Sequence, residues 1–236
     1  MIHKSISQFL TLSSIILAVL SCSKEDGPKP AEPALLLLPS NGENCKQGEI
    51  VSDDVSIVNF SWELADNADN YSITITNLQT LDETKRYDIE SNGISIYLDS
   101  GYHYKWSVTS FSSNFPDETP TSETWRFYLQ RLNQTNSPPF PVEAVTPNPG
   151  EVISIVENQL FSLEWDGEDP DNDKLVYSVF LDTLDGRQPT SDDLKNLQSS
   201  NVEVLLQSNK IYYWSVVAED VLSNTSTSQV FSFRTR

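Results

Sequence analysis

A run of acidic and amide side chains is the part of the sequence best suited to bind a ligand. Residues 166–174 read Asp-Gly-Glu-Asp-Pro-Asp-Asn-Asp-Lys, in which Asp169, Asp171 and Asp173 alternate and Asp166 precedes them. Calcium takes about six to eight oxygen ligands, and spaced carboxylates on an irregular backbone can converge on one such ion. We therefore predict a calcium site at Asp166, Asp169, Asp171 and Asp173, with Ca²⁺ as the candidate cofactor.

The spacing of this loop is not that of an EF-hand. Lys174 stands where an EF-hand requires glycine, and Phe180 stands where its bidentate glutamate belongs. The segment resembles the Asp-Pro-Asp-Gly-Asp loop of bacterial cadherin-like and fibronectin-like modules, some of which bind calcium. A turn of Asp, Asn and Pro that joins two strands is the alternative interpretation, and it needs no metal.

The residues needed for nucleophilic or acid–base catalysis are scarce. The chain has two histidines and two cysteines, and His3 falls in an N-terminal leader described below. His103 lies between Tyr102 and Tyr104, so in a strand we expect it to point away from a core-facing Tyr104, toward the surface. No motif gives His103 a nucleophile, and Cys45 is expected to be an inert thiol. We predict that the protein is not an enzyme; an enzyme of unfamiliar type is the remaining alternative.

Two loop aromatics, Phe111 and Phe115, are candidate partner contacts. They lie in the segment Phe-Ser-Ser-Asn-Phe-Pro, which precedes two acidic residues. Aromatic side chains on a loop can anchor a protein or stack on a sugar ring when a rigid scaffold presents them. The alternative is structural: Phe111 caps the end of a core and Phe115 packs under the following proline.

The N-terminus has the composition of an export signal. Lys4 provides a positive flank, Phe9–Leu20 is a short apolar run, and the small Ser21 precedes Cys22. The run is too short for a membrane span of about 20 apolar residues. Its ending, Val-Leu-Ser-Cys, resembles the lipobox of bacterial lipoproteins, in which the cysteine becomes the acylated first residue. We predict a signal peptide at 1–21 and lipid on Cys22; an ordinary secretory signal with an incidental cysteine is the alternative.

Residues 22–33 are expected to form a tether between the lipid and the first domain. Lys24, Glu25 and Asp26 resemble the signal that directs some Gram-negative lipoproteins to the outer face of the outer membrane. The alternative is a solvated charged tether. Under either interpretation, the three prolines that follow stiffen the segment toward an extended form. With acyl chains on Cys22, this segment predicts a protein anchored in the outer membrane and facing the exterior.

Composition and charge restrict the kinds of partner. Thirty-four acidic residues against 15 basic ones give a formal charge of −19, which repels phosphate backbones. We therefore expect no nucleic acid as a partner. Apolar residues make up 38% of the chain and aromatic residues 10%, which suits a packed core and not a disordered acidic chain.

An internal repeat supplies the elements that must position these residues. Blocks of the first half recur in the second at nearly constant spacing: Pro39–Glu43 as Pro147–Glu151, Trp62 as Trp165, Tyr71–Ile75 as Tyr177–Leu181, Tyr104–Val108 as Tyr212–Val216, and Trp125–Phe127 as Phe231–Phe233. The blocks alternate large apolar with small or polar side chains, which is typical of strands buried on one face. The predicted fold class is all-β, with antiparallel β-sandwiches at 34–130 and 142–236 and a proline-rich linker at 131–141.

The spacing of Leu98, a turn and Tyr104 resembles the fibronectin type III domain, and Leu206 and Tyr212 repeat it. The resemblance implies that the tyrosine hydroxyl forms a hydrogen bond back across the corner of the sandwich. It also implies that Trp62 and its counterpart in the second repeat are core residues of an early strand. The linker is predicted to be a semi-rigid spacer that gives the domains a preferred orientation without a shared core.

These patterns together predict a non-catalytic, lipid-anchored surface protein that binds or spaces its partners through the loops of its sandwiches. Its partners are expected to be the lipid bilayer, through the acyl chains, and an extracellular or envelope protein or a glycan. The alternative is a carbohydrate-binding accessory lipoprotein of a polysaccharide-uptake system. That function needs coplanar exposed aromatics, whereas most aromatics here occupy alternating, core-like positions.

Overall fold

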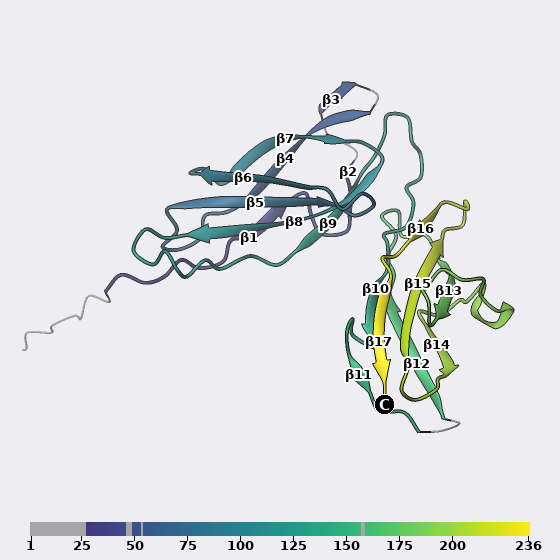
Figure 1. The fold of residues 1–236 in the computed structure, drawn as a ribbon. Coiled ribbons are helices and arrows are strands. Elements are labelled where there is room, and N and C mark those ends of the chain that lie inside the picture. The colour runs from purple at the N-terminus through teal and green to yellow at the C-terminus, as the bar shows by residue number, and fades with distance from the viewer. Residues whose placement is uncertain (1–26, 46–48, 53, 157–158) are drawn as a thin grey trace, which may run out of the picture.

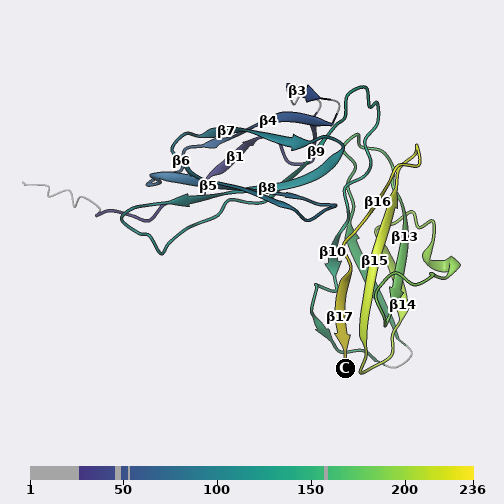
Figure 2. The same ribbon diagram turned by 45° about the horizontal axis from the view of Figure 1, so that its top comes forward.

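A computed structural model of the chain describes residues 27–45, 49–52, 54–156 and 159–236. The described residues form two β-sandwiches that meet end to end at a bend (Figures 1 and 2). The predicted lipidation site Cys22 and the predicted export signal Lys24, Glu25 and Asp26 lie outside the described residues. Within the part of the chain that is described, no helix is long and apolar enough to cross a membrane.

The first sandwich packs a four-stranded sheet against a five-stranded sheet. In the first sheet the order is β1 (Leu35–Leu38), β4 (Val55–Glu63) and β3 (Glu49–Ser52), with β7 (Gly93–Asp99) also paired to β4. In the second sheet it is β2 (Glu43–Cys45), β9 (Trp125–Leu129), β8 (Tyr102–Phe111), β5 (Asn70–Asn77) and β6 (Glu83–Ile89). All of these pairs are antiparallel except β2 with β9.

The second sandwich repeats this architecture. One sheet has the order β10 (Glu143–Thr146), β12 (Leu160–Asp166) and β14 (Asn201–Leu205). The other has the order β11 (Val152–Ile153), β17 (Phe231–Thr235), β15 (Ile211–Glu219) and β13 (Val176–Asp182), with β16 (Thr225–Thr227) also paired to β15. A 3₁₀ turn, η1 (Asp192–Leu194), lies between β13 and β14 and belongs to neither sheet. The predicted fold class, all-β with two tandem antiparallel sandwiches, is confirmed.

Each sandwich has its own aromatic core, because the alternation seen in the sequence places one face of every long strand inward. Trp62 is fully buried and meets Tyr71 edge to face at 5.5 Å, and Trp165 meets Tyr177 in the same way at 5.4 Å. Trp106 is buried as well, with its ring edge to face with that of Phe60 at 5.1 Å.

The corner that the spacing of Leu98 and Tyr104 implied is present in both domains. The Tyr104 hydroxyl donates a hydrogen bond of 2.8 Å to the backbone carbonyl of Asp99. In the second domain the Tyr212 hydroxyl accepts one of 2.9 Å from the backbone N–H of Gln207. These bonds tie the start of β8 and of β15 to the turn before each strand.

Candidate functional site at the domain junction

The linker between the sandwiches is packed against both of them. Ser137 and Phe140 are fully buried. The backbone N–H of Phe140 donates to the Glu168 carbonyl at 2.9 Å, and that of Ser137 donates to the Asp171 carboxylate at 2.7 Å. On the other side, the Pro138 carbonyl lies 3.0 Å from a ring nitrogen of His103 in the first domain. The linker therefore fixes one sandwich to the other instead of merely spacing them.

His103 is fully buried, so its predicted position at the surface is wrong. Its side chain does leave the strand opposite the core residue Tyr104, but the linker covers that outer face of the sheet. The ring lies 4.7 Å from Tyr128 and 4.9 Å from Phe140, measured between centroids. Alternation along a strand gives the direction of a side chain and says nothing about a distant segment that covers it.

The hydrogen bonds of His103 define its neutral form. Nε2 faces the Pro138 carbonyl, which can only accept, and Nδ1 lies 2.6 Å from the side-chain amide nitrogen of Gln79, which can only donate. The proton therefore belongs on Nε2. Burial lowers the pKa of His103 to about 4; the Pro138 carbonyl opposes this shift and the charge of Arg126 adds to it.

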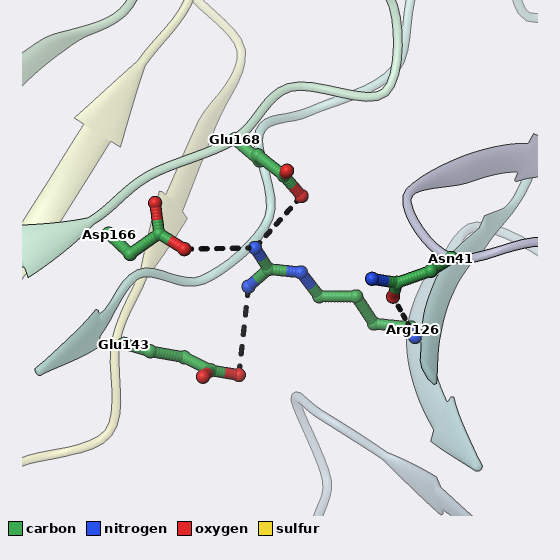
Figure 3. Close-up of polar contacts among 5 residues, drawn as sticks. All are labelled: Asn41, Arg126, Glu143, Asp166 and Glu168. Carbon is green, nitrogen blue, oxygen red and sulfur yellow. Dashed lines mark hydrogen bonds and ion pairs between the residues drawn. The ribbon is translucent and has the colours of Figure 1, made fainter. Parts of the chain in front are cut away.

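Arg126 on β9 reaches across the junction to three carboxylates of the second domain (Figure 3). Its guanidinium nitrogens lie 2.9 Å from Glu168, 3.6 Å from Glu143 and 3.7 Å from Asp166. The arginine side chain is only 12% exposed, whereas its three partners are 53% to 72% exposed. Solvent screens the carboxylates, so each pair contributes modestly and the cluster as a whole defines the geometry.

The structure separates the four aspartates predicted to bind calcium into two groups. Asp166 pairs with Arg126, and Asp171 accepts hydrogen bonds on both oxygens, from the Asn44 side chain at 2.9 Å and from the Ser137 backbone at 2.7 Å. These two residues therefore connect the domains. Asp169 and Asp173 instead converge with a third carboxylate.

The third carboxylate is Asp220, which begins the turn between β15 and β16. One oxygen from each of Asp169, Asp173 and Asp220 lies within 4.8 Å of the others. Asp220 could not be predicted from the sequence, because it stands far along the chain from the alternating acids and belongs to no spaced motif. Asp220 follows the end of β15, and the fold brings that end close to the acidic loop that follows β12.

A polar groove of about 930 Å³ is lined in part by Asp169 and Asp173. Its lining comes mainly from the loop after β12, from Asn41 and Gly42 of the first domain, and from residues 198–201 at the start of β14. Gly167 is required in its wall, because a Cβ atom there would lie 2.5 Å from the Tyr177 hydroxyl oxygen. The groove therefore exposes the acidic loop and one turn of the first domain to the same solvent space.

Phe111 and Phe115, the predicted partner contacts, lie far from this junction. Both are half-buried; Phe111 is the last residue of β8 and Phe115 follows the strand, whereas His103 lies at its start. The backbone there is tied to Asp69, which accepts from Ser113 and donates to Phe111. Eight residues of strand rise by about 27 Å, so these aromatics belong to the opposite end of the first domain.

Comparisons with known proteins complete the description of the chain. No protein-family model and no curated protein matches this sequence. Among solved structures, the fibronectin(III)-like modules of Clostridium thermocellum CbhA match 86% of this chain and 92% of theirs, at 12% identity and a TM-score of 0.31. A two-domain fibronectin type III segment of chicken tenascin matches 86% and 97% at 13% identity and a TM-score of 0.27, and the FN1–FN3 domains of chicken CNTN1 match 86% and 65% at 16% identity and a TM-score of 0.29. The chain is thus similar to tandem fibronectin type III modules, and this similarity assigns no role to any of its residues.

Proposed function

We propose that this protein is a non-catalytic, lipid-anchored module of the cell surface that presents its second domain to a partner at a fixed orientation. The observation that carries the proposal is the burial of Phe140 between the domains. A flexible connection leaves its aromatic side chains in solvent, whereas Phe140 is fully buried and lies against His103 and Arg126. Ordering a linker costs conformational entropy, so such packing is typical of a connection whose geometry matters.

The direction of the chain supports a display function. The described residues begin at one end of the first domain, where the backbone N–H of Glu32 donates to the Asp66 carbonyl at 2.9 Å. The junction lies at the other end of that domain, and the second domain continues beyond it (Figure 1). A lipid on Cys22 therefore places Phe111 and Phe115 near the membrane and the loop 206–210 of the second domain far from it. We expect a protein or glycan partner to contact the distal loops.

A carbohydrate-binding accessory function is less well supported. In the described ranges, the aromatic side chains that are mostly exposed are Tyr87 and Tyr97, each 65% exposed. Tyr87 lies on β6 and Tyr97 on β7, which belong to different sheets. These two rings therefore do not share the sheet face that a flat sugar platform requires. A glycan array together with affinity capture from envelope extracts separates a sugar partner from a protein partner.

Small-angle X-ray scattering of residues 27–236 tests the fixed orientation. We expect the scattering to fit one bent arrangement, and we expect Phe140→Ala to broaden the distribution of interdomain distances. The matched control is Phe111→Ala, which removes the same side chain from the far end of the first domain and should leave the distribution unchanged. Wild-type scattering that requires many orientations would contradict the proposal.

A further inference from the structure

We propose that Asp169, Asp173 and Asp220 bind one calcium ion beside the domain junction. This goes beyond the proposed display function, which needs no metal. The set also differs from the one predicted from the sequence, since it omits Asp166 and Asp171 and includes a residue of the turn between β15 and β16.

The first observation is the distance between the three carboxylates. Calcium–oxygen distances are about 2.3 to 2.6 Å, so two oxygens on one ion can be at most about 5 Å apart. The ligand atoms of the three aspartates all lie within 4.8 Å of one another. The three side chains can therefore contact a single ion with little movement of the backbone.

The second observation, independent of this clustering, is an unpartnered oxygen on Asp169. The residue is only 9% exposed. Its Oδ1 accepts from the backbone N–H groups of Asp171 at 2.8 Å and Asp173 at 3.1 Å, but its Oδ2 is buried without a hydrogen-bond partner. A buried carboxylate oxygen without a partner is costly, and a bound cation removes that cost.

The surroundings of Asp169 contain negative charge that the chain itself does not neutralise. Burial raises the pKa of Asp169, the carboxylates of Asp173 and Asp171 add to the increase, and two backbone N–H groups oppose it. No cationic side chain is among these influences. A divalent ion would supply the positive charge that these contacts lack.

The other two ligands are held in place by neighbouring amides. Asp220, 5% exposed, accepts from the backbone N–H groups of Leu222 at 2.7 Å and Asn224 at 2.9 Å. Asp173 accepts from the side chain of Asn136 at 2.7 Å, and Asn136 in turn accepts from the side chain of Asn224. Because Asn136 belongs to the linker, an ion at this site also restrains the linker. Such outer contacts orient metal ligands and tune affinity.

The ligand chemistry selects calcium. The three donors are carboxylate oxygens, which suit hard cations, and no histidine or cysteine is among them. Magnesium needs a tight octahedron, which two surface loops provide less readily than the larger and more variable shell of calcium.

Isothermal titration of the full chain, purified in a nonionic detergent, with CaCl₂ and separately with MgCl₂ tests the site. We expect one Ca²⁺ per chain with a Kd of about 10⁻⁴ to 10⁻³ M, the range of extracellular modules, and weaker Mg²⁺ binding. Asp169→Asn and Asp220→Asn should abolish saturable binding. Asp193→Asn, which removes one exposed carboxylate of the same domain, should leave it unchanged.

Asp171→Asn distinguishes this site from a site built on the alternating acids. Because Asp171 faces Asn44 and Ser137, its replacement should leave calcium binding intact. If Asp169→Asn or Asp220→Asn loses its β-sheet circular dichroism, the test uses Asp173→Asn instead. Asp173 is only half-buried, so this variant should fold and should lose calcium binding. Absence of saturable binding to the wild type, or unchanged binding in the properly folded Asp169, Asp173 or Asp220 variants, would overturn the proposal.

Discussion

The guanidinium of Arg126 lies over the ring of Phe140, with its central carbon 5.1 Å from the ring centroid. A cation over an aromatic face is attracted by the negative charge of that face, most strongly where water is excluded. The same guanidinium faces Glu168 of the second domain at 2.9 Å. A single side chain of β9 thus contacts the linker and the second sandwich together.

Replacing Arg126 by glutamine should loosen this junction. Gln lacks both the charge and the planar guanidinium group that faces the carboxylates. Because those carboxylates are partly exposed, we expect the free energy that stabilises the packed junction to fall by only about 1 kcal/mol. The amide hydrogen of Phe140, bonded to the Glu168 carbonyl, should then exchange about fivefold faster. Exchange measured by mass spectrometry checks this, with Arg234→Gln, an exposed arginine on β17, as the control. Equal exchange in both variants would show that Arg126 does not stabilise the junction.

The junction should weaken as the pH falls. The pKa of His103 is lowered to about 4 in the folded state, from 6.5, so between these values the unfolded chain binds a proton that the folded chain does not. Stability from this residue is therefore present above pH 6.5 and is lost as the pH falls toward 4. The linkage relation gives a loss of about 2 kcal/mol between about pH 7.5 and pH 5.

Urea unfolding of the wild type and of His103→Gln at both pH values isolates this contribution. Glutamine does not titrate, so the variant should lose less stability on acidification, by about the same 2 kcal/mol. Acidic groups elsewhere affect both proteins alike. A pH dependence that is identical in the two proteins would mean that His103 is protonated as easily in the folded as in the unfolded chain.

Tyr104→Phe should destabilise the first domain. The substitution removes a hydroxyl that donates to the Asp99 carbonyl at 2.8 Å and leaves that carbonyl without this donor. We expect a loss of about 1 to 2 kcal/mol in the free energy of unfolding. Tyr87→Phe removes a hydroxyl from an exposed ring and should change stability by less than about 0.5 kcal/mol. Urea denaturation of both variants measures the difference.

The lipid anchor is tested on Cys22, outside the described residues. Mass spectrometry of the mature protein should find an acylated N-terminal Cys22, and Cys22→Ala should leave the membrane fraction. Cys45→Ala is the matched control and should stay in the membrane fraction. An unmodified mature protein that begins at another residue would exclude the anchor.

The direction of export is tested on Lys24, Glu25 and Asp26. Replacing all three by alanine should keep the lipid but reduce digestion of the protein by protease added to intact cells. Unchanged digestion would identify the segment as a tether only.

The sequence predicts the fold well because the fold depends on patterns among residues that are close together along the chain. Trp62, Tyr71 and Tyr104 recur with similar spacing in the second half, and strand alternation alone places them in a core. The burial of His103 and the position of Asp220 are different, because each depends on a segment that is distant along the chain. The linker covers His103, and the end of β15 brings Asp220 to the acidic loop; neither fact is visible in a window of neighbouring residues.

The acidic loop shows the same limit within one motif. Asp166, Asp169, Asp171 and Asp173 look equivalent in the sequence, as evenly available carboxylates. The fold distinguishes them through their surroundings: Arg126 faces Asp166, the linker backbone faces Asp171, and the other two meet Asp220. The spacing of these residues therefore predicts where the acidic loop lies, but it does not predict which contact each aspartate makes.

The packed linker also gives the protein a mechanical property. If a partner pulls on the second domain while the first is held at the membrane, the load passes through residues 131–141. Eleven residues in extended form span at most about 35 to 40 Å. Peeling Phe140 and Ser137 from their contacts would release part of that length before either sandwich lost a strand, so the junction would behave as an extensible element in series with two stiff ones.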